Sequence, residues 1–96
     1  MTFNEVLISN KNVLIDFYSS TCPPCKLLEK ELQEVKKALG DRVEIFKVDQ
    51  EEQASIFKAF DVKQLPHVKL FKSGRPVWEY SGLLSSDEFI EEILKR

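Results

Sequence analysis

The sequence predicts an α/β fold in which a four-stranded mixed sheet is sandwiched by about four helices, and three observations predict it. The apolar run over residues 13–18 is continuous rather than alternating, which is typical of a strand buried on both faces by helices. Segments with helical and strand patterns follow one another in the order α-β-α-β-α-β-β-α, without a repeat or a linker. A chain of 96 residues, 43% of them hydrophobic, suits one domain with a single core over residues 1–96.

Charge and hydropathy exclude several classes of partner. A formal net charge of −2 provides no basic surface for nucleic acid or for an anionic membrane. The longest apolar runs, of about four to six residues, are far shorter than the roughly 20 residues that span a bilayer. Residues 1–5 lack the basic and apolar regions of a signal peptide. We therefore expect a cytoplasmic monomer with no nucleic-acid or membrane partner.

The start of the chain predicts a helix followed by the buried strand. Thr2 and Glu5 form the Ser/Thr-x-x-Glu pattern of a capping box, which predicts a short helix over residues 2–8. Polar residues 10–12 interrupt this helix. The β-branched and aromatic residues 13–18 then form the first strand.

A turn over residues 19–24 leads from this strand to a long helix. Pro24 suits the first turn of that helix, because the N–H that proline lacks has no intrahelical partner there. Gly40 supplies the C-terminal stop. The apolar residues of the helix repeat at helical spacing, and they are Leu28, Leu32, Val35 and Leu39.

The second half of the chain predicts two further helices and three strands. In order, we expect a strand over Val43–Asp49, a helix over 51–60, a strand over 68–72, a hairpin loop over 73–76 and a strand over 77–81. Ser85 and Glu88 form a second capping box, which opens the last helix. Its apolar face consists of Phe89, Ile90, Ile93 and Leu94.

The motif Cys22-Pro23-Pro24-Cys25 lies where the first strand leads into the long helix. Near a helix N-terminus, free N–H groups and the helix dipole stabilise an anion, here a Cys22 thiolate. A separation of three residues in a helix brings Cys25 within reach of a disulfide with Cys22. We expect Cys22 to be the exposed nucleophile and Cys25 to be a more buried resolving thiol.

Three other interpretations of the cysteine pair remain open beside redox exchange. Zn²⁺ requires four ligands, and only His67 could join the two cysteines. A purely structural disulfide would constrain little, because the loop that it closes is short. An iron–sulfur cluster would have to be shared between two chains. Redox exchange is favoured because the motif lies in a βαβ context, and we expect no metal and no cofactor.

At this point the chain resembles the thioredoxin family over nearly its whole length. Five segments in the family's order and spacing carry the resemblance: Val13-Leu14-Ile15-Asp16-Phe17-Tyr18, Cys22-Pro23-Pro24-Cys25-Lys26, Lys47-Val48-Asp49, Leu65-Pro66 and Ser81-Gly82. The resemblance implies a thioredoxin fold, here beginning at the first helix and lacking the extra leading strand. It also implies a thiol–disulfide oxidoreductase.

The resemblance further implies a surface that binds substrate beside the cysteines. Its expected residues are Thr21, Pro23, Leu65, Pro66 and Gly82. Pro66 corresponds to the family's cis-proline, and the N–H and C=O of Leu65 would pair with an extended substrate segment. The alternative is an ordinary trans-proline at the start of a strand. Gly82 would line the groove where backbone approaches substrate, or would be only a turn residue before the last helix.

Asp16 is an acid inside the otherwise apolar first strand. Burial disfavours its charged form and raises its pKa, which suits a proton acceptor at neutral pH. The resemblance implies that Asp16 takes, through water, the proton of Cys25, and that Lys47 lies near this acid and tempers its pKa. A buried ion pair or a half-exposed acid at the edge of the strand are the alternatives.

The sequence departs from the family pattern around the motif. Thr21 and Tyr18 stand at common tryptophan positions, so the aromatic rim of the groove is thinner. Pro23 replaces the usual glycine, which stiffens the turn and leaves the Cys25 N–H able to bond the Cys22 sulfur. His67 is unusual after the proline; it is either a satisfied imidazole or a charge that tunes the cysteines. Trp78 is expected on the fourth strand, away from the pair.

The leading hypothesis for function is a dithiol–disulfide oxidoreductase that reduces disulfides of protein substrates. Electrons would come from a flavin-dependent reductase of the thioredoxin-reductase type, since the chain has no dinucleotide fingerprint of its own. An oxidase or isomerase is an alternative within the same class. A redox-silent binding module that holds its partner through Leu65 and Pro66 is an alternative from another class.

Overall fold

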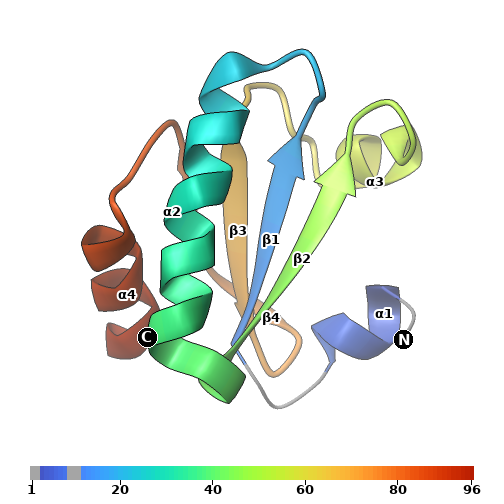
Figure 1. Ribbon diagram of the computed structural model, residues 1–96. Coiled ribbons are helices and arrows are strands. Elements are labelled where there is room, and N and C mark those ends of the chain that lie inside the picture. Colours follow the sequence, from blue (N-terminus) through green and yellow to red (C-terminus); the bar gives the residue numbers. More distant parts are fainter. Residues whose placement is uncertain (1–2, 9–11) are drawn as a thin grey trace.

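Strand β1 (Asn12–Tyr18) lies inside a four-stranded sheet whose order is β2-β1-β3-β4 (Figure 1). It pairs in parallel with β2 (Val43–Asp49) and antiparallel with β3 (His67–Lys72). β3 in turn pairs antiparallel with the edge strand β4 (Arg75–Ser81). This computed structural model describes residues 3–8 and 12–96 of the chain. The mixed four-stranded sheet that the sequence predicts is confirmed.

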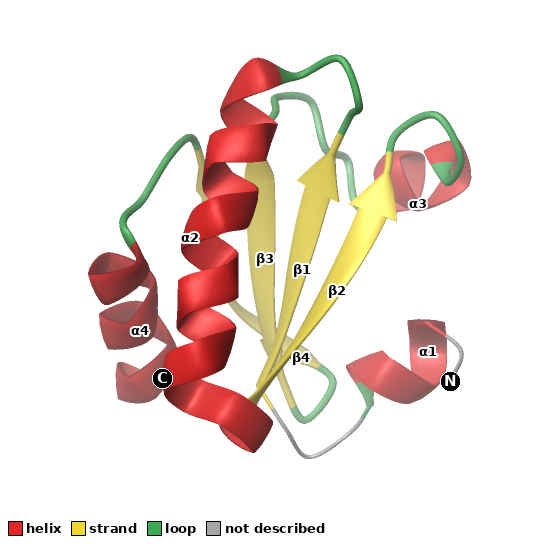
Figure 2. Cartoon of the chain, in the orientation of Figure 1, coloured by secondary structure: helices red, strands yellow, loops and turns green. Residues whose placement is uncertain are grey.

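Helices cover both faces of the sheet, as the cartoon in Figure 2 shows. Their bounds are α1 Phe3–Leu7, α2 Pro23–Leu39, α3 Ala54–Ala59 and α4 Ser86–Lys95, with a short 3-10 helix η1 over Gly40–Arg42. α2 and α4 lie on one face, and α1 and α3 lie on the other (Figure 1). No helix within the described residues is long and apolar enough to span a membrane.

Burial along β1 explains why its sequence is continuously apolar. Val13, Ile15 and Phe17 point into the core on the α1 and α3 face, where Phe57 of α3 also packs. Leu14 belongs to the opposite core, which α2 and α4 complete. Because successive side chains of a strand face opposite sides, a strand with a helix layer on each side needs apolar residues at every position. Asp16 interrupts this pattern on the α2 face.

The long helix α2 begins and ends where sequence reasoning places its signals. Its N-cap is Cys22, and prolines occupy its first positions. At the other end Gly40 has φ +55°, and its N–H donates to the Lys36 carbonyl. Such a left-handed conformation favours glycine. The four leucine and valine residues predicted to face inward are all buried.

The third helix and the hairpin loop differ most from their predicted bounds. The helix expected over residues 51–60 begins only at Ala54, because residues 50–52 form turns in which the Glu51 N–H donates to Asp49 Oδ1. The hairpin loop is shorter than expected. Ser73 and Gly74 both have positive φ, as a two-residue hairpin turn requires, so β4 already begins at Arg75.

The last helix α4 has the predicted capping box in full. Ser85 Oγ accepts from the Glu88 N–H, and the Glu88 carboxylate accepts from the Ser85 N–H. Phe89 and Ile93 are buried on the predicted face, but the expectation for Leu94 is wrong, because its side chain is 53% exposed. The first capping box, from Thr2 to Glu5, involves a residue outside the described part of the chain.

Candidate active site

The cysteine pair lies at the N-terminus of α2, directly after the turn that follows β1. Cys22 is the N-cap residue, and its Sγ accepts a hydrogen bond from the Cys25 N–H at 3.2 Å. Pro23 and Pro24 carry no N–H, so the Cys25 N–H is the first donor that the helix offers. The predicted contact between the Cys25 N–H and the Cys22 sulfur is therefore confirmed, as is the place of Pro24 in the first turn of α2.

Cys22 and Cys25 are joined by a disulfide, with their Cα atoms 5.3 Å apart. The two sulfurs differ in accessibility. Cys25 is buried, with 3% of its surface exposed, whereas Cys22 is half-buried and its neighbours Thr21 and Pro23 are exposed. An attacking molecule can therefore reach Cys22 but not Cys25, as the two predicted roles require. No group of three or more His, Cys, Asp or Glu within the described residues could hold a metal ion.

Ser19 is a residue of this turn that was not predicted from the sequence. Its hydroxyl is buried in the bend, where it donates to Glu51 Oε1 at 2.7 Å and accepts from the Thr21 N–H at 3.2 Å. Its carbonyl accepts from the Cys22 N–H at 3.2 Å. A serine between a strand and a helix N-cap is a common turn former, and that was the available signal. Ser19 thus fixes the backbone that presents Cys22.

Asp16 lies beneath α2 and is 1% exposed. Its Oδ1 has no hydrogen-bond partner within residues 3–8 and 12–96. Burial raises the pKa of Asp16 from 3.8 to about 6, with Lys47 lowering it and Glu29 raising it further. The predicted buried acid is confirmed. Both alternatives are wrong, because Asp16 is neither half-exposed nor in an ion pair within 4.0 Å among the described residues.

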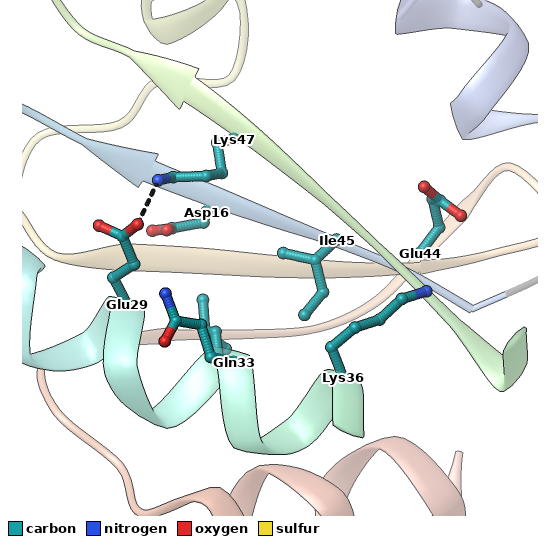
Figure 3. A pocket seen from close by; sticks show the side chains of 8 residues that line it. Asp16, Glu29, Gln33, Lys36, Glu44, Ile45 and Lys47 are labelled. Carbon is teal, nitrogen blue, oxygen red and sulfur yellow. Dashed lines mark hydrogen bonds and ion pairs between the residues drawn. The ribbon is translucent and has the colours of Figure 1, made fainter. Parts of the chain in front are cut away.

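A cavity of about 270 Å³ opens beside Asp16, between α2 and β2 (Figure 3). Its polar lining residues are Asp16, Glu29, Gln33, Lys36, Glu44 and Lys47. A space of this size admits water, and the polar lining provides partners for it. The carboxyl of Asp16 therefore has a route to solvent along the α2 face of the sheet.

Lys47 stands beside Asp16 in the register of β1 and β2, as the resemblance implies. Its ammonium, however, pairs with Glu29 of α2, at 2.9 Å between Nζ and Oε1. Burial lowers the pKa of Lys47, but the hydrogen bond and charge of Glu29 outweigh it and raise the pKa above its ordinary value. Lys47 also lies 4.9 Å above the ring of Tyr18. Glu29 was not predicted as a site residue, although its position four residues after Cys25 places both on one face of the helix.

The Leu65–Pro66 peptide bond is cis, so Pro66 is not the ordinary trans-proline of the alternative interpretation. β3 runs antiparallel to β1 with His67 opposite Phe17, which places Pro66 at the level where β1 leads into the cysteine turn. The carbonyl of Pro66 accepts from the Gly82 N–H at 2.9 Å. Within residues 3–8 and 12–96, neither the N–H nor the C=O of Leu65 bonds to another backbone group.

Gly82 has φ +115°, a conformation that favours glycine. A Cβ atom there would meet Tyr80 Cε2 at 3.6 Å, an ordinary contact. Backbone conformation therefore accounts for this glycine, as the turn interpretation requires. Its hydrogen bond to Pro66 also keeps it beside the predicted groove.

His67 is a satisfied imidazole. Its Nδ1 contacts Ser81 Oγ, and its Nε2 lies 3.1 Å from Glu79 Oε2, both on the neighbouring strand β4. The hydrogen bond from His67 and the nearby Lys69 lower the pKa of Glu79. Trp78, also on β4, packs edge-on against Phe89 of α4, at 6.1 Å between ring centroids. Neither side chain forms part of the cysteine turn.

Comparison with known proteins finds one family. A family model described as Thioredoxin matches residues 1–95. The chloroplastic thioredoxin Y of Oryza sativa subsp. japonica is 38% identical over 93 residues, which make up 96% of this chain and 55% of the rice protein. The thioredoxin of Rickettsia prowazekii (strain Madrid E) is 32% identical over 92 residues, or 96% of this chain and 88% of that protein.

Solved structures agree with these relatives. Thioredoxin-2, a component of the protein secretion machinery of the malaria parasite, superposes with a TM-score of 0.89 at 27% identity. The match covers 92% of this chain and 85% of that one. The chain spans about half the length of the chloroplastic relatives, between 54% and 56%.

Proposed function

The chain belongs to the thioredoxin family, and from that premise we propose that it is a thiol–disulfide oxidoreductase that reduces disulfides in protein substrates. One observation carries the proposal: a Cys22–Cys25 disulfide at the N-terminus of α2, with one sulfur accessible and the other buried. Two sulfurs in such a place can exchange a disulfide with an incoming molecule.

In the first step the Cys22 thiolate attacks one sulfur of the substrate disulfide. A bond forms between Cys22 Sγ and that sulfur, and the other substrate sulfur leaves as a thiolate. The Cys25 N–H and the N-terminus of α2 favour the negative charge on Cys22, because both direct positive ends of dipoles at its sulfur. Thr21 and Pro23, both exposed, would contact the substrate around this sulfur.

In the second step Cys25 resolves the mixed disulfide. Its thiol loses a proton to the Asp16 carboxylate through water, and the thiolate attacks Cys22 Sγ. The Cys22–Cys25 bond forms, the bond to the substrate breaks, and the substrate leaves with two more electrons than it brought. Burial of Asp16 supports this role, because it raises the pKa of the carboxyl group to about 6. A general base works best when its pKa lies near the pH at which the protein operates.

The substrate would lie across the loop that precedes β3. The backbone N–H and C=O of Leu65 are available to pair with an extended segment, which is how a short strand adds to a sheet edge. Pro66 and Gly82, joined by their own hydrogen bond, would form the floor beside it. This arrangement recognises the backbone of the substrate rather than particular substrate side chains.

The direction of electron flow, the electron donor and the cellular place belong to the same proposal. We assign the protein the role of a reductant in the cytoplasm, acting as a monomer and recharged by a flavin-dependent reductase of the thioredoxin-reductase type. The reduction potential of the Cys22–Cys25 pair, measured against glutathione, tests the direction. A potential of about −270 mV fits a reductant, and a potential of about −120 mV would make the protein an oxidant instead.

The activity itself is tested by reduction of the insulin disulfides with dithiothreitol as the electron source. We expect the wild-type protein to accelerate the reaction and Cys22→Ser to abolish the acceleration. Reduced Cys25→Ser protein, freed of dithiothreitol before substrate is added, should accumulate a mixed disulfide with substrate, because no second thiol is present to resolve it. A wild-type protein that leaves insulin unreduced, yet binds a partner equally well in its Cys22→Ser form, would be a redox-silent binding module.

A further inference from the structure

The strand register favours an ion pair between Asp16 and Lys47, but Lys47 pairs with another residue. Asp16 of β1 and Lys47 of β2 are direct neighbours in the parallel pair, so their side chains point to the same face of the sheet. An ammonium beside a buried carboxylate would ordinarily form an ion pair with it. Lys47 instead extends to Glu29 of α2, at 2.9 Å between Nζ and Oε1 (Figure 3). Among the described residues, Asp16 Oδ1 has no hydrogen-bond partner.

Glu29 reaches this place because of its position in α2. It follows Cys25 by four residues, so the two side chains lie on one face of the helix, one turn apart. Glu29 and Asp16 line the same cavity of about 270 Å³, with Lys47 between β2 and the helix. Through its ion pair with Lys47, Glu29 thus links α2, which carries the resolving thiol, to the sheet that carries Asp16.

We propose that Glu29 is a positioning residue for proton transfer: it holds the Lys47 ammonium away from Asp16 and thereby sets the pH range in which Asp16 accepts the proton of Cys25. The inference rests on the proposed function of Asp16 in resolving the mixed disulfide. The proton moves from Cys25 Sγ to Asp16 and then through the cavity to solvent, while the electron pair left on Cys25 forms the bond to Cys22.

The other charged groups that line the cavity either bond to groups other than Asp16 or lie at the far end of the cavity. Lys36 of α2 donates to the backbone carbonyls of Gly40 and Val43, at 3.0 and 2.7 Å. Glu44 of β2 lines the far part of the cavity, as Figure 3 shows. Tyr18 of β1 lies under the Lys47 ammonium. Beyond burial, Lys47 and Glu29 are the groups that shift the pKa of Asp16, in opposite directions.

The direct test follows the titration of the Asp16 carboxyl by NMR in the reduced protein. Glu29→Gln removes one negative charge near Asp16 and frees the ammonium of Lys47 to approach it. Both changes favour the carboxylate, so we expect the pKa of Asp16 to fall by about one pH unit. The matched control is Glu34→Gln, the same change on the same helix, where the exposed carboxylate pairs with Lys37 and lies outside the cavity beside Asp16. Equal titration of Asp16 in the two variants would overturn the proposal.

A second measurement separates capture of Lys47 from the bare charge of Glu29. Lys47→Met should raise the pKa of Asp16, since it removes the ammonium that lowers it. In that background Glu29→Gln should shift the titration less than in the wild type, because no ammonium remains to be released. A shift of the same size in both backgrounds would contradict the capture of Lys47.

The consequence for exchange is read from the pH dependence of the rate at which Cys25 resolves a preformed mixed disulfide. Glu29→Gln should move the acid side of that profile to lower pH by the same amount as the Asp16 titration, whereas Glu34→Gln should leave it in place. Asp16→Asn tests the underlying function separately. If that variant resolved the mixed disulfide at the wild-type rate, Asp16 would not be the proton acceptor, and the role of Glu29 in exchange would fall with it. An unmoved titration in Glu29→Gln together with a slow Asp16→Asn would overturn the role of Glu29 alone.

Discussion

At the scale of single residues, a buried carboxyl group lies at the position where the proposed chemistry needs a base. Asp16 is 1% exposed, and its Oδ1 accepts no hydrogen bond from the part of the chain that the structure describes. An acid in such surroundings is more stable protonated than charged. At neutral pH the folded protein therefore carries a buried charge that destabilises it. The same burial raises the pKa of Asp16, so that its carboxylate is basic enough to take a proton.

Replacing Asp16 by Asn should therefore slow exchange several-fold and stabilise the fold at neutral pH. The pKa of Asp16 rises from 3.8 to about 6 on folding, so between these values the folded state holds more protons and stability falls as pH rises. Above pH 6 the full penalty applies, which corresponds to about 3 kcal/mol. Below pH 3.8 Asp16 is protonated in both states and the penalty disappears.

Urea unfolding of the oxidised proteins at pH 4 and pH 8 checks this prediction. Asp16→Asn should exceed the wild type in free energy of unfolding at pH 8 and nearly equal it at pH 4. A gain of the same size at both pH values would mean that the amide packs better, and that the buried charge is not the cause.

The sequence predicts some of these residues and misses others, for a physical reason. Cys22, Cys25 and Asp16 stand out because a thiol pair at a helix start and an acid in an apolar strand are unusual by themselves. Ser19 and Glu29 do not stand out, because turn serines and helix glutamates are common. Their importance comes from the partners that the fold supplies, Glu51 for Ser19 and Lys47 for Glu29, and that pairing depends on segments far apart in the chain.

At the scale of elements, strands were predicted closely and short connections less so. β2 has the predicted bounds, Val43–Asp49. α3 is shorter than its helical pattern, since Asp49 and Gln53 side chains hold the preceding backbone in turns. Asp and Gln hydrogen bonds of this local kind compete with the helix, and periodicity does not detect them.

The capping box of α4 provides a prediction at this scale. Ser85→Ala removes the acceptor of the Glu88 N–H and should lower the free energy of unfolding by about 1 kcal/mol. The control is Ser86→Ala, one residue later, where the contact to Glu31 uses the backbone N–H and survives the change. Chemical denaturation of both variants checks it. Equal losses in the two variants would show that general packing of the helix start, rather than the cap, is responsible.

At the scale of the whole molecule, the sheet separates two cores, and its strands β1, β2 and β3 contribute side chains to both. Leu14 contributes to the core beneath α2 and α4, while its neighbours Val13 and Ile15 contribute to the core beneath α1 and α3. This division could be predicted from the continuous apolar strand. The order of the strands could not, because it depends on which strands pair along their edges, and those strands are far apart in the chain. The shared strands, with β1 buried on both faces, should make the two cores unfold together.

Unfolding should therefore be cooperative across the sheet, and the single tryptophan makes this testable. Trp78 packs on Phe89 in the α2 and α4 core, whereas Phe57 packs edge-on against Phe17 in the opposite core, at 5.3 Å between ring centroids. Phe57→Leu should lower stability by about 1 kcal/mol or more. In urea, Trp78 fluorescence and far-UV circular dichroism should shift to lower midpoints together, since both follow one two-state transition. If Trp78 kept its wild-type midpoint while the dichroism signal became biphasic, the two cores would be separate folding units, and burial of β1 on both faces would not suffice to couple them.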